Sequence, residues 1–441
     1  MSAERVLVVG GGISGLATAY YLSKAGVPVT LVERHPRLGG VITTETVEGC
    51  VIEGGPDSFL AAKPAALELI RELGLEGEVI GSNDHQRVTY IVRNGDLVPM
   101  PDGLMMMVPT KIWPMATTPL LGLSTKIRMG LEYFRSPPAA PAEDRTVSDF
   151  VSDHYGAEAV EYLAEPLLAG VYGGSPDRLS VSATLPRFVE LEQKYGSLTK
   201  GVLSGPRPGP GSGSLFKTLK RGLASLVEAL QPHVRNVIHG EAEAFEPGRL
   251  RVNGEWLEAS QIVLACPAHE AGLLLEGADR QLAATLSSID YTSSITLALG
   301  YKRSRIAHPL NGFGFLVPRK ERGALVACTW VGTKFSHRVP DGWALLRCFL
   351  TGTEFDQSRV EEELARLMGI TVKPDFVRAS RWPRAMAQYT VGHAARIAEI
   401  ENRAAAIPSL HLVGNAYQGI GIPDCIRMGK QAAAKIASGR S

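Results

Sequence analysis

The clearest alternation of apolar and polar positions lies at the start of the chain. Residues 5–9 form a short apolar run typical of a buried parallel strand, and three glycines follow at 10–12. The next residues repeat apolar side chains at helical spacing, and 27–32 is a second apolar strand that ends at Glu33. The pattern predicts a strand, a glycine turn, a helix and a second strand ending in an acid.

The spacing of the glycines is that of a dinucleotide-binding turn. Gly10 permits the tight turn, Gly12 lets a diphosphate approach the backbone, and Gly15 lets the helix pack closely on the strand. Free N–H groups at the positive end of the helix would bind the diphosphate. Glu33, about 20 residues on, can accept hydrogen bonds from both ribose hydroxyls and would repel the extra phosphate of NADP. The turn residues expected to contact the cofactor are Gly10, Gly11, Gly12, Ile13, Ser14 and Gly15.

The remaining pattern alternates between strands and helices along the whole chain. Strands are predicted at 51–52, 235–252, 255–266, 292–300, 312–317, 325–331, 344–350 and 410–413, with a hairpin over 88–98 that turns at 94–95. Helices are predicted at 64–73, 116–133, 147–168, 215–219, 222–230, 360–368 and 425–437. Proline-rich loops occupy 136–144 and 204–214, and the second is expected to be the most flexible stretch. Because both ends are strand–glycine–helix units, we expect them to build one nucleotide domain.

Composition adds limits to this picture. A chain of 441 residues is expected to form two or three domains, and its formal charge of +1 argues against a nucleic-acid partner. Five scattered cysteines without a C-x-x-C pair predict buried reduced thiols in a cytosolic protein. The first strand begins almost at once, so no signal peptide is expected. No histidine spacing typical of a metal site stands out, and no metal is assigned.

One stretch leaves two interpretations open. Residues 104–123 are the most apolar part of the chain, but Pro109, Lys111, Pro114 and Pro119 interrupt them. A straight membrane-spanning helix is therefore not expected. The stretch is either the core of a helical domain or a surface that dips into a bilayer or lines an apolar channel.

Several longer motifs, taken together, resemble one family. G-G-G-I-S-G-L-A at 10–17 and R-L-G-G at 37–40 are similar to the broad superfamily of the monoamine oxidases and phytoene desaturases. E-G-G-P-D-S-F at 53–59, E-P-L-L-A-G-V-Y-G-G at 165–174 and G-N-A-Y-Q-G-I-G-I-P-D-C-I at 414–426 resemble the flavin-dependent porphyrinogen oxidases. The loop at 53–59 and V-P-T-K-I-W-P at 108–114 look closest to the bacterial coproporphyrinogen III oxidases.

The resemblance implies an α/β fold of the amine oxidase type. Its Rossmann-like FAD-binding domain, of the two-dinucleotide-binding-domain class, would hold an inserted antiparallel β substrate domain and an inserted helical domain. The expected FAD-binding segments are 1–80, 213–270 and 386–441. The expected insertions are a helical, substrate-facing domain at 81–212, of which 104–134 are the candidate for membrane contact, and a β-rich substrate domain at 271–385.

The resemblance also implies which residues hold FAD. Besides the first turn and Glu33, it implies contacts from Arg34, Gly39, Gly40, Gly54, Gly55, Pro56, Asp57, Val237, Trp382, Gly414, Asn415, Gly421, Ile422 and Pro423. Val237 would lie by the adenine. A helix starting near Asp424 would place its positive end at the pyrimidine edge of the flavin, where reduction adds negative charge.

The implied substrate is a porphyrinogen, a flexible tetrapyrrole with propionate arms. Arg87 and Lys63 match positions to which the family assigns propionate contacts, and Asp57 matches a catalytic position beside the reacting carbon. The implied reaction is repeated hydride transfer to the flavin with loss of a pyrrole proton, followed by reoxidation by dioxygen. Coproporphyrinogen III is the favoured substrate, and protoporphyrinogen IX is the alternative substrate. Two other functions are less favoured: an amine oxidase or desaturase, and a non-catalytic flavin- or NAD-binding module.

The resemblance leaves the cellular context less defined. A cytoplasmic protein is expected, with peripheral attachment to the inner face of the cell membrane left open. A ferrochelatase partner and the choice between monomer and dimer also stay open at this point.

Overall fold

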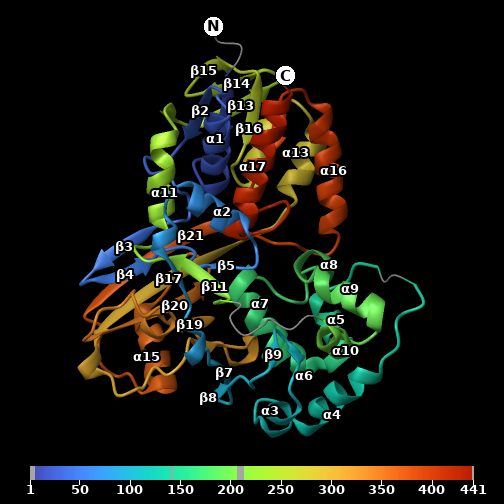
Figure 1. Cartoon of the computed structure of the whole chain (residues 1–441), viewed down its shortest axis with the longest axis vertical. Coiled ribbons are helices and arrows are strands. Elements are labelled where there is room, and N and C mark those ends of the chain that lie inside the picture. Colours follow the sequence, from blue (N-terminus) through green and yellow to red (C-terminus); the bar gives the residue numbers. More distant parts are fainter. Residues whose placement is uncertain (1–4, 141–142, 206–212, 440–441) are drawn as a thin grey trace.

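The structure is a computed structural model that describes residues 5–140, 143–205 and 213–439. Figure 1 shows three parts: the two chain ends and the yellow-green middle segment lie together at the top, a β-sheet lies at the lower left, and a helical block lies at the lower right. The loop predicted at 204–214 falls mostly on 206–212, outside the described residues.

A five-stranded parallel sheet joins three distant segments of the chain. β1 (Val6–Val9) lies at its centre and pairs with β2 (Val29–Glu33) on one side and β16 (Gln261–Leu264) on the other. β12 (Val237–His239) and β22 (Leu410–Leu412) form its two edges. The two ends of the chain therefore do build one nucleotide-binding sheet, as the hydrophobic pattern predicts.

Helices cover this sheet on both faces (Figure 1). α1 (Ile13–Lys24) packs directly on α17 (Ile422–Ser438), so closely that a Cβ at Gly429 would lie 2.8 Å from the Ser14 carbonyl oxygen. The other helices of this part are α2 (Ala65–Glu72), α11 (Ala224–Leu230), α12 (Ala268–Leu275), α13 (Arg280–Ser287) and α16 (His393–Ala406). Small sheets border them: β3 (Thr44–Val47) with β4 (Cys50–Glu53), and β13 (Ala242–Glu246) with β14 (Arg249–Val252) and β15 (Glu255–Glu258).

A seven-stranded sheet forms the second layer, and its pairing is antiparallel except where β18 meets β7. The hairpin predicted over 88–98 is confirmed, with positive φ at both Asn94 and Gly95. In spatial order the strands are β21 (Phe376–Ala387), β17 (Tyr291–Lys302), β20 (Trp343–Thr351), β19 (Ala327–Trp330), β18 (Gly314–Leu316), β7 (Thr89–Arg93) and β8 (Asp96–Pro99). The amphipathic helix α15 (Gln357–Met368) covers one face.

The third part is a helical block with its own apolar core. The helix expected at 116–133 is instead two helices, α3 (Ile112–Thr117) and α4 (Leu123–Leu131), because Pro119 interrupts the chain between them. The helix expected at 147–168 is also not continuous: Gly156, with positive φ, ends its first part, and a π-helical turn follows at Val160–Ala164. The remaining helices of the block are α5 (Val147–Tyr155), α6 (Ala157–Ala159), α7 (Glu165–Tyr172), α8 (Val181–Thr184), α9 (Pro186–Tyr195) and α10 (Leu198–Ser204).

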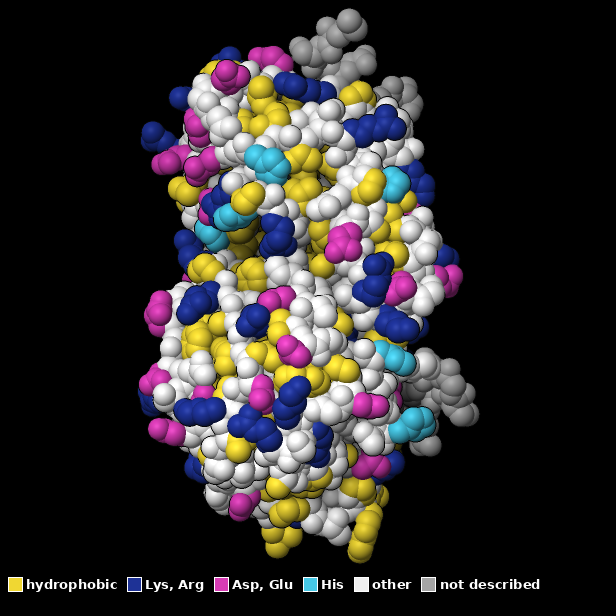
Figure 2. All heavy atoms as spheres, turned by 90° about the vertical axis from the view of Figure 1, so that its left-hand side faces the viewer, with side chains coloured by type: hydrophobic (Ala, Val, Ile, Leu, Met, Phe, Trp, Pro, Cys, Tyr) yellow, Lys and Arg dark blue, Asp and Glu magenta, His cyan; other side chains and the backbone are white. Residues whose placement is uncertain are grey.

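An apolar face stands on the outside of this block. Ile112 and Trp113 are 89% and 76% exposed. We call the exposed set the α3–α4 apolar face; it consists of Ile112, Trp113, Leu123, Ile127, Leu131 and Phe134. α3 and α4 lie at the bottom of the molecule in Figure 1, and Figure 2 shows hydrophobic side chains protruding at that end. In the described part of the chain, no helix is both long and apolar enough to cross a bilayer.

One further expectation about secondary structure is wrong, and one strand was not expected. Residues 215–219 form a strand, β11 (Phe216–Leu219), because they pair with β5 (Phe59–Leu60) and β6 (Val79–Gly81), and this tertiary pairing outweighs the local helical spacing. The strand β21 was not predicted, since it is an edge strand whose many exposed polar side chains and Pro383 hide the strand pattern.

The cysteines lie as predicted, with one exception. Cys50, Cys328, Cys348 and Cys425 are buried and free, whereas Cys266 is only half-buried.

Prediction for stability. Burial lowers the pKa of His393 to about 4, and its ring stacks on Tyr389 at 3.9 Å. The unfolded chain titrates near 6.5, so between these values it binds a proton that the folded protein does not. The free energy of unfolding should therefore fall as the pH drops from about 6.5 to about 4, by up to roughly 3 kcal/mol from this residue.

Thermal unfolding of wild type and His393→Phe across this pH range checks the sign. The variant keeps an aromatic ring against Tyr389 but cannot titrate, so its melting temperature should depend less steeply on pH. Burial also lowers the pKa of His411 to about 4, which explains why some slope should persist. Equal slopes for the two proteins would contradict the assignment.

Candidate functional site

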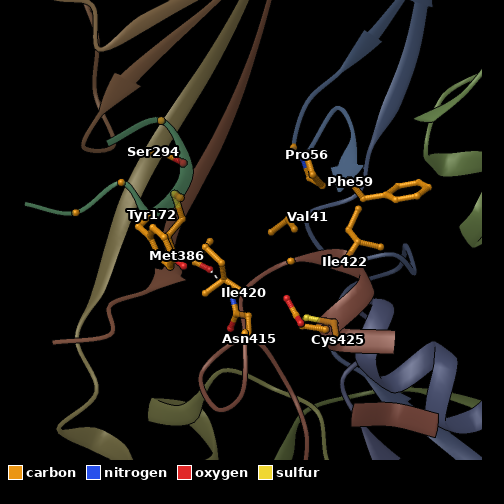
Figure 3. A pocket seen from close by; sticks show the side chains of 18 of the residues that line it. Val41, Pro56, Phe59, Tyr172, Ser294, Met386, Asn415, Ile420, Ile422 and Cys425 are labelled. Atoms are coloured by element: carbon orange, nitrogen blue, oxygen red, sulfur yellow. Dashed lines mark hydrogen bonds between the residues drawn. The ribbon is translucent and has the colours of Figure 1, made fainter. Parts of the chain in front are cut away.

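One large cavity of about 3330 Å³ connects the three parts of the molecule. It begins where β1 and β2 end, passes the turn before α17, and opens between the seven-stranded sheet and the helical block. Figure 3 shows its middle section, with Val41, Pro56 and Ile422 on one side and Tyr172 and Met386 on the other. A cavity of this size exceeds the usual range of about 300–1,000 Å³ for a small-molecule site, so it has room for more than one ligand.

The first glycine turn is open where a diphosphate needs space. A Cβ built on Gly12 has no atom within 4 Å, and Gly12 precedes the first residue of α1 without a side-chain cap. In contrast, a Cβ on Gly15 would lie 1.9 Å from the Gly10 carbonyl oxygen. Gly10, Gly12, Ile13 and Ser14 line the cavity, so the residues present fit a diphosphate at the helix start.

Glu33 lies at the end of β2 and is held in one orientation. Its two carboxylate oxygens accept hydrogen bonds from the backbone N–H groups of Gly11, at 2.6 Å, and His35, at 2.8 Å. The side chain is buried but still lines the cavity, and each oxygen retains a lone pair for a ribose hydroxyl. Arg34 also lines the cavity, although its guanidinium pairs with Glu270 at 3.2 Å. This geometry would allow the ribose contact predicted from the spacing, which stays a prediction.

The second glycine pair lies directly against the first turn. Gly39 donates its N–H to the Gly11 carbonyl at 2.8 Å, and Gly39 and Gly40 both have positive φ. A Cβ on Gly40 would come within 3.1 Å of Gly12 Cα. The Arg37 guanidinium donates to surrounding carbonyls and so braces the turn. The predicted role of the pair in close backbone approach is consistent with this arrangement.

Some expected cofactor residues support the cavity without lining it. Gly11, Gly15 and Gly54 lie behind its wall, and Gly54 accepts a 2.7 Å hydrogen bond from the indole N–H of Trp382. Val237, in β12, packs against the core and does not line the cavity. The residues of this region that line it are 240–243. The cavity lining thus begins three residues after Val237, and the adenine contact expected there stays a prediction. The expected residues Gly55, Pro56 and Trp382 do line the cavity.

The turn at 414–421 closes the cavity floor and is held by Tyr389. The Tyr389 hydroxyl donates to the Asn415 carbonyl at 2.9 Å and accepts from the Gly419 N–H at 2.8 Å. The amide of Asn415 donates to the Ala385 carbonyl, which ties the turn to β21. Figure 3 shows Asn415 and Ile420 below Met386.

The N-terminus of α17 faces the same space. The helix begins at Ile422, close to the expected start, and the lining includes Gly414, Asn415, Gly421, Ile422 and Pro423. A helix of 17 residues places positive partial charge at its first turn, where it can stabilise negative charge on a bound ring. Asp424 in that turn pairs with Lys63 at 2.6 Å. Lys63 thus reaches the helix start while its side chain stays about half exposed.

Asp57 is an ionised carboxylate between two cations. Burial alone would raise its pKa, but the Lys334 ammonium at 2.8 Å and the Arg347 guanidinium at 3.5 Å hold that pKa well below its usual range. Ser58 donates a further hydrogen bond at 2.6 Å. Because the carboxylate lines the cavity and stays charged, it can accept a hydrogen bond from a ligand N–H but is a weak base.

Of the two cations expected to bind the substrate, Lys63 is paired with Asp424, whereas Arg87 is unpaired in the described part of the chain. It is exposed, lines the cavity, and has no ion-pair partner among the residues that the structure describes. Lys334 and Arg347 were not anticipated, because they lie 277 and 290 positions from Asp57 and only the tertiary fold brings them to it. Within the described ranges no His, Cys, Asp and Glu cluster could hold a metal ion.

Comparison with known proteins places these features in context. A family model described as flavin containing amine oxidoreductase matches residues 13–437. The coproporphyrinogen III oxidase of Bacillus subtilis (strain 168) is 35% identical over 97% of both chains, and the protoporphyrinogen oxidase of Bos taurus is 30% identical over 98% of both. A solved structure from Exiguobacterium sp. 255-15 superposes with a TM-score of 0.89 at 32% identity, over 100% of each chain.

Prediction for the cofactor turn. Gly12→Ala should leave the stability of the FAD-free protein within about 0.5 kcal/mol of wild type, since its Cβ meets open space. The same methyl group would occupy the space reserved for the diphosphate, so FAD affinity should fall at least about tenfold. Equilibrium titration of the apoprotein with FAD, followed by flavin fluorescence, measures the loss.

Gly15→Ala is the matched comparison. Its Cβ would collide with the Gly10 carbonyl, so this variant should lose stability even without FAD, by roughly 1–3 kcal/mol. If both variants lost stability equally and Gly12→Ala bound FAD normally, the diphosphate would not lie at this turn.

Proposed function

We propose that this chain, which belongs to the flavin-containing amine oxidoreductase family, oxidises a porphyrinogen to a porphyrin in haem biosynthesis. The observation that carries the proposal is the large cavity of the described residues, which joins the turns expected to hold FAD to a second, cation-bearing space beside them. Relatives that match nearly the whole chain are named coproporphyrinogen III oxidase and protoporphyrinogen oxidase, which supports the same substrate class.

Coproporphyrinogen III is the substrate that we favour. Seven similar relatives bear that activity in their names, including those of Bacillus subtilis and Staphylococcus aureus. The cations on the cavity wall suit a substrate with four carboxylates. Protoporphyrinogen IX, with two carboxylates, is the second candidate, favoured by the similarity to the Bos taurus enzyme.

The chemistry divides between cofactor and protein. FAD bound in the cradle would accept a hydride, which carries two electrons, and dioxygen would take these two electrons back from the reduced cofactor and form hydrogen peroxide. The protein's own part is to bind and orient the macrocycle: Arg87 and Lys63 offer charge to its propionates, and Asp57 offers a fixed anion to its pyrrole N–H groups. The walls of the seven-stranded sheet and of the helical block exclude water around the ring.

An amine oxidase or desaturase activity is less well supported. An amine site needs free aromatic faces in front of the flavin, but Tyr389 is buried and hydrogen-bonded to the turn at 414–421, and the Trp382 N–H is bonded to Gly54. Both rings thus support the backbone around the cavity.

We also propose that the α3–α4 apolar face contacts a lipid surface. Trp113 and Phe134 are each more than three-quarters exposed, and Lys111, Lys126 and Arg135 lie in the same segment. An apolar face bordered by cations suits a bilayer with anionic headgroups. As a protein partner we propose a ferrochelatase, which would consume the porphyrin product.

Prediction for activity. The purified protein should contain FAD, and anaerobic addition of coproporphyrinogen III should bleach its absorbance while porphyrin fluorescence appears. Arg87→Ala should raise the KM for the porphyrinogen about tenfold or more at unchanged FAD content, since it removes one charge-assisted hydrogen bond. An FAD-loaded protein that stays oxidised with both porphyrinogens but is reduced by an amine would replace this function with the amine oxidase alternative.

Prediction for the lipid surface. The protein should sediment with vesicles that contain phosphatidylserine, and the double variant Trp113→Asp/Phe134→Asp should bind at least about tenfold more weakly because two apolar side chains no longer enter the bilayer. Trp256→Asp, which changes an exposed tryptophan on β15, serves as the control and should bind like wild type. Equal sedimentation of all three proteins would show that this face does not meet lipid.

A further inference from the structure

Lys334 is a cation of the cavity wall to which the motifs assign no role. It is the last residue of α14 (Val331–Lys334), directly after β19 of the seven-stranded sheet. Its backbone carbonyl accepts a 2.9 Å hydrogen bond from the Asn83 N–H, which begins the short loop leading to Arg87. This hydrogen bond therefore links the segment that carries Lys334 to the loop that carries Arg87, although the two cations are far apart in sequence.

The surroundings of the Lys334 ammonium are mostly nonpolar. The side chain is 13% exposed, and Nζ lies 5.3 Å from the ring centre of Phe216 and 5.2 Å from that of Phe335. Among the described residues its one hydrogen-bond acceptor is Asp57, at 2.8 Å. An ammonium carries three N–H donors, so two remain for a group inside the cavity.

The local charges do not cancel. Asp57 is shared between Lys334 and Arg347, and the Arg347 guanidinium is already committed to the carbonyl oxygens of Glu53 and Gly55. Behind them Arg338 and Glu53 form a fully buried pair at 2.7 Å, which is neutral as a pair. The wall thus keeps one positive charge in excess, in a setting where an uncompensated charge is costly.

We propose that Lys334 forms a carboxylate subsite that binds one propionate arm of the substrate, with Asp57 as the anion that positions its ammonium. This inference rests on the proposed porphyrinogen oxidation and deepens it by naming a further binding residue. Pro56 and Asp57 lie on the loop that leads to β5, which begins at Phe59, and Figure 3 shows Pro56 and Phe59 near Val41. A propionate at Lys334 thereby places the attached pyrrole near the loop that carries Asp57.

The test compares a charged substrate with an uncharged one. Lys334→Met should raise the KM for coproporphyrinogen III about ten- to a hundredfold, the loss expected for one charge-assisted hydrogen bond. For the tetramethyl ester of the same porphyrinogen, which carries no carboxylate, wild type and variant should have the same KM. Lys334→Arg should restore most of the affinity for the free acid, because a guanidinium also binds carboxylates.

Controls separate this role from folding and from the cofactor. Lys320→Met, which removes a lysine outside the cavity that pairs with Glu161, should behave like wild type. FAD content and melting temperature are recorded for every variant, and Lys334→Gln replaces Lys334→Met if the latter does not fold.

Four distinct outcomes would overturn the inference. An equal rise in KM for acid and ester would mean a purely structural role. An unchanged KM with slower reoxidation by dioxygen would mean that the ammonium serves the flavin. If wild type oxidised neither substrate, the proposed function itself would fail, whereas an active wild type with an unaffected variant removes Lys334 alone.

Discussion

The pairing of β1 with strands from both later segments is the constraint on which the rest of the molecule depends. β1 bonds to β2 within the first segment and to β16 more than 250 residues away, and β16 in turn bonds to β22 near the end of the chain. Since carboxyl ends of parallel strands meet at one edge, the turns that follow these strands must converge. A Cβ on Gly10 would lie 2.9 Å from the Ala265 carbonyl oxygen, which shows how closely two of those turns approach. The cofactor cradle therefore exists only when all three segments are paired.

A second set of contacts fixes the inserted sheet against this cradle. Arg338 is 1% exposed and bonds to Glu53, to the Thr218 hydroxyl and to the Leu219 carbonyl, so one guanidinium joins three segments. Breaking such a buried pair by removing one partner is strongly destabilising, because it leaves an uncompensated charge. Arg347 makes a similar connection: its guanidinium, on β20, donates hydrogen bonds to the carbonyl oxygens of Glu53, at the end of β4, and of Gly55, in the loop that follows. Both arginines bond to residues of β4 or of its following loop, and this anchoring positions the loop that carries Asp57 at the cavity.

Much of the cradle could be predicted from local sequence, because its requirements are local. The turn needs glycine at position 12 to leave space for a diphosphate, and at position 15 to let the helix pack tightly. The acidic residue that binds the ribose must follow the second strand. The residues that complete the site obey no such spacing. Lys334 reaches Asp57 only because the inserted sheet packs against the loop after β4, and β11 is a strand only because β5 and β6 flank it. These properties arise from tertiary pairing, which no short window of the chain encodes.

The charge on Asp57 constrains how a porphyrinogen could react in this cavity. Each oxidation of the macrocycle removes a hydride from carbon and a proton from a pyrrole nitrogen, and the proton needs an acceptor. With its pKa held low by Lys334 and Arg347, the Asp57 carboxylate is a poor final acceptor at neutral pH, since proton transfer to it is unfavourable. The same fixed charge favours a pyrrole N–H pointing toward it, however, and that preference orients the ring. On the function proposed above, Asp57 therefore acts on the substrate's geometry and electrostatics, and the proton must pass to another acceptor.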